Sequence, residues 1–253
     1  TPYLVSAADL RDRLTTLREQ LDPKHADAAL DNIVVIGHSM GGLVAKLLAV
    51  EGGDDFWRLV CAQPEDFLQV KPETRAELQR IFYFHPQPSV RRVVFVATPH
   101  HGAKISNSPP AKLASQFVHL PKSLTDAARD AAQQNPTAEF RFAPDRLPNS
   151  LTLLRPGDPG LELLAARPCP PGIHFHSVVG LAPPTAAVAE RLLAVTLPTE
   201  KTDGVVTYAS AHLDGVDSEC VVPADHTHVQ SHPRTLQEVR RILREHVREA
   251  SDR

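Results

Sequence analysis

A serine stands at the centre of a glycine-rich turn near the start of the chain. Residues 37–41 read Gly-His-Ser-Met-Gly and match the pattern G-x-S-x-G. The run NIVVI over residues 32–36 precedes the turn and is typical of a buried parallel strand, and an apolar helical face follows over residues 43–48. A strand-to-helix turn holds a serine Oγ clear of the sheet, at a helix N-terminus where developing negative charge is stabilised. We therefore predict that Ser39 is a nucleophile and that the backbone N–H of Met40 is the first oxyanion donor.

The glycines of this turn have a steric reason. A serine on so sharp a turn adopts a strained backbone conformation, and flanking residues without a Cβ avoid clashes. The alternative is a glycine-rich turn that packs a strand against a helix, as in a dinucleotide-binding fold. The fingerprint of that fold, G-x-G-x-x-G, is absent here.

A serine hydroxyl needs a base to remove its proton, and the base needs an acid to orient it. With this turn the expected chain order is serine, then acid, then histidine, each on a loop after a strand. Asp203 follows the predicted strand FHSVVG (175–180) and lies in the turn TDGVV, so it is the predicted acid. Glu200 and Asp214 are less well placed. An aspartate in such a turn can also serve only as an Asx turn or a helix cap.

Three histidines compete for the role of base. His226, His228 and His232 all follow the last predicted strand, ECVVP (219–223). His226 comes three residues after Pro223, at the end of that strand, and is the predicted base. His228 is the alternative.

The same histidines have the spacing H-x-H-x-x-x-H, which could hold zinc, with His100 and His101 as further ligands. The chain contains 13 histidines, and clusters of this kind then arise by chance. We predict no metal site and no cofactor.

The remaining elements supply the frame. We predict three further helices: over the leucine repeat 10–21, around residues 73–84 and over the apolar repeat 236–247. Asp22-Pro23 ends the first of them. A further buried strand is predicted at 93–97 (VVFVA). The alternation of strands and helices predicts an α/β fold, with a mostly parallel sheet and helices on both faces. Residues 103–172 are rich in proline and lack a strong strand, so we interpret them as an insertion, a candidate lid, between core segments 1–102 and 173–253.

Composition restricts the partners. The chain has 253 residues, with 27 Lys and Arg against 30 Asp and Glu and a formal charge of −3, so there is no basic excess for nucleic acid. No apolar run approaches the roughly 20 residues that span a bilayer, and we expect a soluble chain, cytoplasmic or exported if a signal precedes residue 1. Three cysteines leave at least one thiol unpaired within the chain.

Taken together, GHSMGGLVAKLLA, VVFVATPHHGA, TDGVV and the closing VVPADHTH resemble the bacterial lipase and esterase branch of the α/β-hydrolase superfamily. The resemblance covers roughly residues 8–250 and is loose over 103–172. It implies an α/β-hydrolase fold with Ser39 as nucleophile, Asp203 as acid and His226 as base. Many relatives have glycine before the base where this chain has Asp225, which keeps His228 open as the base.

The start of the chain departs from this family. Relatives place several strands and the loop of the second oxyanion donor before the nucleophile, but only about 30 residues precede the NIVVI strand. The resemblance therefore implies that the N-terminal strands are missing from this chain. Either an N-terminal segment of a longer protein or a second chain then completes the sheet, whose edge is otherwise left with unpaired backbone groups.

These patterns favour hydrolysis of carboxylic esters through an acyl-enzyme, with a small-molecule or lipid ester as substrate. The alternatives are an acyltransferase, thioesterase or amidase with the same triad, or a non-catalytic interaction module. Leu43, Phe56 and Trp57 line an acyl site or simply pack in the core.

Overall fold

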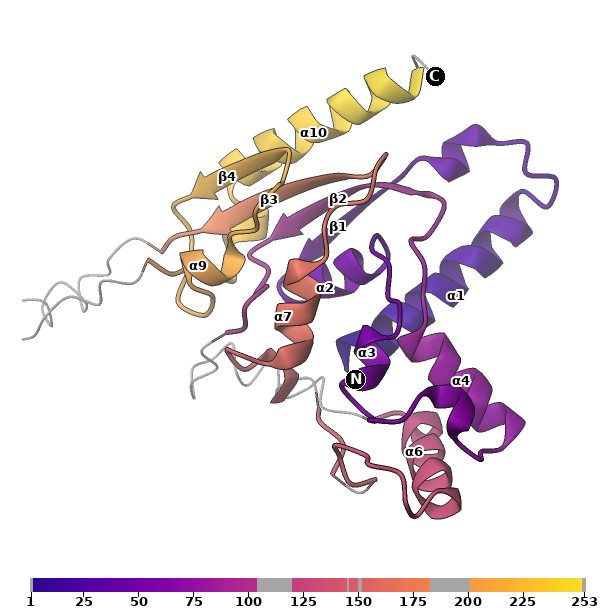
Figure 1. Ribbon diagram of the computed structural model, residues 1–253. Helices are drawn as coiled ribbons and strands as arrows, with labels where there is room; N and C mark the ends of the chain where they lie inside the picture. The colour runs from indigo at the N-terminus through magenta and orange to yellow at the C-terminus, as the bar shows by residue number, and fades with distance from the viewer. Residues whose placement is uncertain (1, 104–119, 145, 150–151, 183–200, 252–253) are drawn as a thin grey trace, which may run out of the picture.

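The computed structural model describes residues 2–103, 120–144, 146–149, 152–182 and 201–251, and all structural statements concern these residues. At their centre lies a parallel sheet of four strands in the order β1-β2-β3-β4 (Figure 1). The strands are β1 (Ile33–His38), β2 (Val90–Val96), β3 (His174–Gly180) and β4 (Ser218–Val222). Each lies within three residues of its predicted range. The predicted α/β class and the parallel sheet are confirmed.

Helices surround this sheet. Their bounds are α1 (Tyr3–Leu21), α2 (Met40–Leu47), α3 (Asp55–Arg58), α4 (Pro72–Phe82), α6 (Lys122–Gln134), α7 (Pro159–Ala166), α9 (Tyr208–Ala211) and α10 (Pro233–Ser251). Short 3-10 turns occupy Ala28–Asp31, Glu65–Phe67, Thr152–Leu154 and Val229–Ser231.

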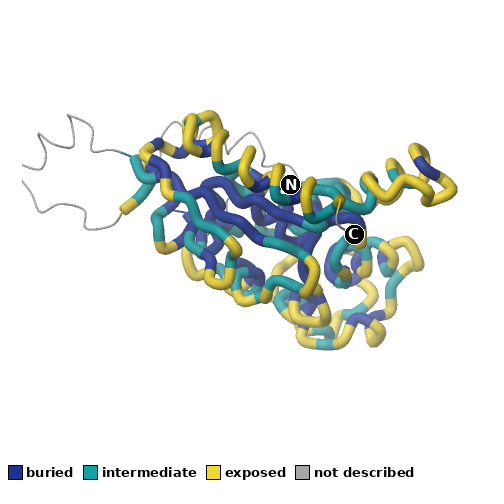
Figure 2. Tube along the Cα trace, turned by 90° about the horizontal axis from the view of Figure 1, so that it is seen from above, coloured by how far each residue is buried: buried dark blue, intermediate teal, exposed yellow. Residues whose placement is uncertain are grey.

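Alternate residues of the strands face opposite layers. Val93 and Phe95 belong to the core that the sheet shares with α1 and α2, whereas Val94 and Val96 belong to the core beneath Ile242 of α10. This is the period-two pattern of a pleated strand covered on both faces. The two central strands, β2 and β3, are mostly buried and form part of the buried centre of the molecule (Figure 2), whereas most residues of the outer strands β1 and β4 are only partly buried.

The two long terminal helices bury less of their predicted apolar faces than expected. In α1 the buried residues are Tyr3, Val5, Ala7 and Ala8 near its start, while Leu17 and Leu21 are 49% and 62% exposed. Leu10 and Leu14, in the first half of the leucine repeat, still pack partly against the core, and Asp12 pairs with Arg80 of α4. The predicted leucine face is therefore wrong in its second half.

In α10 the residues that face the sheet are Thr235, Ile242 and His246, and His246 Nε2 lies 2.9 Å from the carbonyl oxygen of Asn32. Leu236 and Val247, at the two ends of the predicted stripe, are 57% and 63% exposed. Ile242 and Val239 of the predicted stripe pack in the core, so the prediction is right at its centre and wrong at Leu236, Leu243 and Val247.

All four strands lie outside residues 103–172. Within that range the structure describes α6, the turn Thr152–Leu154 and α7. The backbone N–H of Ala103 donates to the carbonyl of Leu154 at 2.8 Å, so the turn Thr152–Leu154 lies against the segment that follows β2. The division into core and insertion stays a prediction.

A helix both long and apolar enough to cross a bilayer does not occur in the described part of the chain.

Candidate active site

Ser39 lies where β1 ends and α2 begins. Its φ of 55° and ψ of −129° are a conformation that residues other than glycine rarely adopt. The N–H of Ser39 donates to the carbonyl of Val96 at the end of β2, 2.9 Å away, and the carbonyl of Ser39 accepts from Gly42 at 3.0 Å. These bonds tie the strained turn to the sheet on one side and to the helix on the other.

Two glycines make this turn possible. A Cβ on Gly37 would lie 2.4 Å from the carbonyl oxygen of Gly41, and one on Gly42 would lie 1.8 Å from Thr98 Oγ1. A Cβ on Gly41 would meet nothing within 4 Å. The steric expectation is therefore right for Gly37 and wrong for Gly41, because Gly42 is the residue of α2 that packs directly on the end of β2.

His226 joins the serine to Asp203. Its Nε2 lies 2.9 Å from Ser39 Oγ, and its Nδ1 lies 2.7 Å from Asp203 Oδ2. Asp203 is 2% exposed and His226 is 7% exposed, so bulk water screens these contacts poorly. Three residues from three distant parts of the sequence thus form one continuous hydrogen-bonded line.

Asp203 both forms an Asx turn and contacts His226. Its Oδ1 accepts from the N–H groups of Val205 and Val206 at 2.9 and 2.7 Å, the geometry of an Asx turn. The other oxygen is left for His226. Gly204 permits this turn with a φ of +97°. The local bonds therefore aim the carboxylate at the imidazole.

The loop after β4 presents His226 inward and His228 outward. The N–H of His226 donates to the carbonyl of Asp203 at 3.0 Å, which joins the two loops through the backbone. The side chain of His228 is 74% exposed, and its Nδ1 lies 2.8 Å from Asp225 Oδ1. Hydrogen bonds from Thr227 and His228 lower the pKa of Asp225 to about 2. Asp225 thus caps the loop, and His228 lies away from Ser39.

The other acidic candidates do not join this group. Asp214 lies on the surface, with its Oδ1 3.3 Å from His212 Nε2. Glu200 lies outside the described residues.

Sequence reasoning missed His38, the residue before the serine. Its Nε2 lies 2.9 Å from the carbonyl oxygen of His226, and the two rings are 5.0 Å apart. Burial is the main cause that lowers the pKa of His38. Because a carbonyl oxygen only accepts, the His38 ring donates from Nε2 and ties the histidine loop to the end of β1. The pattern G-x-S-x-G leaves this position unspecified, so no signal in the motif marks it.

Gly180, at the end of β3, was also missed. A Cβ there would lie 3.0 Å from the carbonyl oxygen of Ala224 and 3.1 Å from Asp203 Cβ. The absence of a side chain lets the aspartate and histidine loops approach each other. Its place at the end of the FHSVVG strand was the available signal.

The predicted oxyanion donor, Met40, is the first residue of α2. The N–H groups in the first turn of a helix have no partner within the helix. A substrate oxygen beside Ser39 therefore meets the positive end of α2. No second donor is assigned among the described residues.

No group of three or more His, Cys, Asp and Glu side chains in the described ranges could hold a metal ion. The arrangement can instead perform acid–base chemistry on an acyl group. His226 can accept the Ser39 proton at Nε2 while Asp203 holds Nδ1–H, and the resulting alkoxide attacks a carbonyl carbon.

The chain is similar to several solved structures, but at low sequence identity. No protein-family model matches the chain, and no curated protein matches it. Among solved structures, the mature form of lipase BlEst2 from Bacillus licheniformis is 12% identical over 90% of this chain and 69% of its own, with a TM-score of 0.45. Lipase 1 from Pelosinus fermentans is 14% identical over 81% of this chain and 68% of its own, with a TM-score of 0.41. EstA from Clostridium botulinum is 15% identical over 79% of this chain and 60% of its own, with a TM-score of 0.40.

Proposed function

We propose that the protein is a serine hydrolase of the lipase and esterase type, which cleaves carboxylic esters through an acyl-enzyme. The observation that carries the proposal is the line from Ser39 Oγ through His226 to Asp203, with contacts of 2.9 and 2.7 Å. A serine, an imidazole and a buried carboxylate in this order activate a hydroxyl on many unrelated folds.

The reaction would proceed in two halves. The Ser39 proton passes to His226 Nε2 as Oγ bonds to the ester carbonyl carbon, and the carbonyl oxygen takes up negative charge beside the Met40 N–H. The C–O bond to the alcohol then breaks, and His226 gives its proton to the departing oxygen. Water next adds to the acyl carbon, with His226 as its base, and releases the acid and Ser39.

The surroundings of Ser39 support an acyl substrate. The strained turn keeps Oγ at the positive end of α2, where an oxyanion is stabilised. His101 and Glu162, 2.9 Å apart, connect the end of β2 to α7. Part of the proposed insertion 103–172 thus lies near the carboxyl ends of the strands, where a small-molecule or lipid ester would bind.

A fluorophosphonate probe tests this proposal directly. Such probes phosphonylate only an activated serine, so we expect stoichiometric labelling of the wild type and none of Ser39→Ala. Ser231→Ala is the matched control, because Ser231 is exposed and its hydroxyl contacts only the carbonyl of His228. The labelled and unlabelled proteins should also differ in turnover of a short p-nitrophenyl ester. Folded wild-type protein that takes up no probe would refute the proposal.

A further inference from the structure

An apolar cavity separate from Ser39 lies between the helices at the N-terminal side of the molecule. It measures about 300 Å³, the lower end of the range for small-molecule sites. The start of α1, α3, α4, α6, the start of α7 and parts of segments 140–144 and 147–148 line it. None of the residues that form the Ser39 site belongs to its wall.

The wall is almost entirely apolar. Its larger side chains include Phe56, Trp57, Ile81, Phe82, Leu124 and Leu153. At its rim, Phe142 is 38% exposed, one of the few large apolar side chains that face solvent among the described residues. A cavity of this composition favours an apolar ligand.

The polar groups of the wall are mostly satisfied. The Trp57 indole N–H donates to the carbonyl of Gln63 at 2.8 Å, and Arg141 Nε donates to the carbonyl of Arg58 at 3.1 Å. Tyr3, a residue that is 1% exposed, also belongs to this wall.

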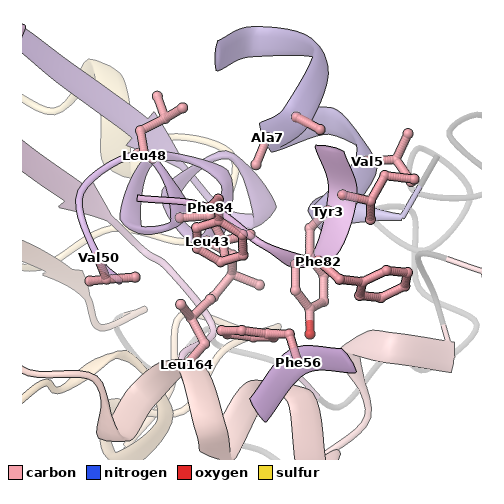
Figure 3. Close-up of a cluster of buried hydrophobic side chains, with 14 of the residues drawn as sticks. Tyr3, Val5, Ala7, Leu43, Leu48, Val50, Phe56, Phe82, Phe84 and Leu164 are labelled. Carbon is pink, nitrogen blue, oxygen red and sulfur yellow. The ribbon is translucent and has the colours of Figure 1, made fainter. Parts of the chain in front are cut away.

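The Tyr3 hydroxyl and Asp158 converge at one end of the cavity. A Cβ on Gly160 would lie 2.7 Å from Tyr3 Oη and 3.1 Å from Asp158 Oδ1, so glycine lets the tyrosine hydroxyl lie close to the backbone beside Asp158. Asp158 Oδ1 already accepts from the N–H groups of Gly160 and Leu161, which leaves its other oxygen available. Figure 3 shows Tyr3 beside Phe56 and Phe82, which line the same cavity.

We propose that this cavity binds an aliphatic alcohol, with its chain against the aromatic wall and its hydroxyl between Tyr3 and Asp158. The hydroxyl of an alcohol accepts from Tyr3 Oη–H and donates to the Asp158 carboxylate, so it can form a hydrogen bond with each of them. A fatty-acid carboxylate would meet the like charge of Asp158, and an alkyl ammonium could not accept from Tyr3. The site does not depend on ester hydrolysis at Ser39.

The protein carries its own reporter of occupancy, because Trp57 is its single tryptophan and lines the cavity. We expect n-octanol to change Trp57 fluorescence saturably, and n-octanoate above neutral pH to bind at least about tenfold more weakly. Loss of one hydrogen bond in Tyr3→Phe should weaken octanol binding about threefold to tenfold. Tyr83→Phe is the matched control, since Tyr83 lies outside the cavity wall, and should leave the affinity unchanged.

Variants that fill the cavity with a larger side chain test whether octanol binds there. Ala131→Leu and Ala128→Leu, both on the α6 wall, should abolish the octanol response, whereas Ala28→Leu on an exposed turn should retain it. Circular dichroism checks folding; if Ala131→Leu fails to fold, Ala128→Leu and Tyr3→Phe still decide the question. The proposal is overturned if octanol gives no saturable response, if octanoate binds as tightly as octanol, or if the filling variants bind octanol normally.

Discussion

Replacement of Asp203 by asparagine should disable His226 by reversing one hydrogen bond. Oδ1 of Asp203 accepts two backbone N–H groups, from Val205 and Val206. In the asparagine variant the side-chain NH₂ group cannot take the place of Oδ1, because it would face the two backbone N–H donors. The side-chain carbonyl oxygen must therefore occupy that place. The NH₂ group then points at His226 Nδ1, which has to become an acceptor, and the imidazole proton moves to Nε2. In that tautomer His226 cannot accept the proton of Ser39.

The size of the effect follows from these contacts. The productive tautomer loses a charge-assisted bond worth about 1.5 to 3 kcal/mol. It also brings two buried N–H groups face to face, which costs about 1 to 3 kcal/mol more. The sum, about 2.5 to 6 kcal/mol, corresponds to a fall in kcat of roughly 70-fold to 25,000-fold.

The assay is hydrolysis of a short p-nitrophenyl ester by Asp203→Asn, together with its rate of fluorophosphonate labelling. Asp225→Asn is the matched control: its carboxylate contacts the exposed His228 and Thr227, and its kcat should equal that of the wild type. An Asp203→Asn variant that keeps more than about a tenth of wild-type kcat would refute the reasoning, because the wrong tautomer alone requires a larger loss. Equal losses in both variants would refute it as well.

Three further predictions concern the frame of the site. Gly42→Ala should lower the free energy of unfolding by about 1 to 3 kcal/mol in urea, because the new Cβ would lie 1.8 Å from Thr98 Oγ1. Gly41→Ala is the control and should not destabilise the fold, because a Cβ there meets nothing within 4 Å. Equal effects of the two substitutions would contradict this steric account. His38→Phe should lower kcat about threefold to tenfold with KM unchanged, since it removes only the bond to the His226 carbonyl, and a change confined to KM would argue against a positioning role. Burial lowers the pKa of Lys46 from 10.5 to about 7. Because the unfolded chain keeps the proton up to higher pH, wild-type stability should rise between about pH 7 and pH 10, by on the order of 4 kcal/mol relative to Lys46→Met, and parallel unfolding curves for the two proteins would contradict this.

The strands and the approach of Ser39, Asp203 and His226 were predictable because each depends on local pattern. NIVVI, VVFVA, FHSVVG and ECVVP are short apolar runs bounded by turn residues, and parallel strands bring their carboxyl ends to one edge. Residues that follow these runs must therefore meet. The catalytic roles themselves stay predictions until Ser39 and its partners are tested.

Features that depend on packing between distant segments were not predictable. Whether Leu17 is buried depends on how far α1 extends over α2, which its own spacing does not reveal. The crowding at Gly42 arises from Thr98, in the segment just after β2, and the role of His38 arises from the carbonyl of His226, far along the chain. The cavity beside Tyr3 is likewise formed by helices that no single sequence pattern connects.

The backbone bonds around His226 have a consequence for how the site would fail. The His226 N–H is bonded to the Asp203 carbonyl, its own carbonyl lies within bonding distance of His38, and Gly180 lets both loops sit in contact. Opening either loop therefore releases the other, so the acid and the base form one cooperative unit of local unfolding. The His226 amide should exchange with solvent only through that shared opening. Heat inactivation would then proceed as a single step, with the base and its acid lost together while the sheet remains folded.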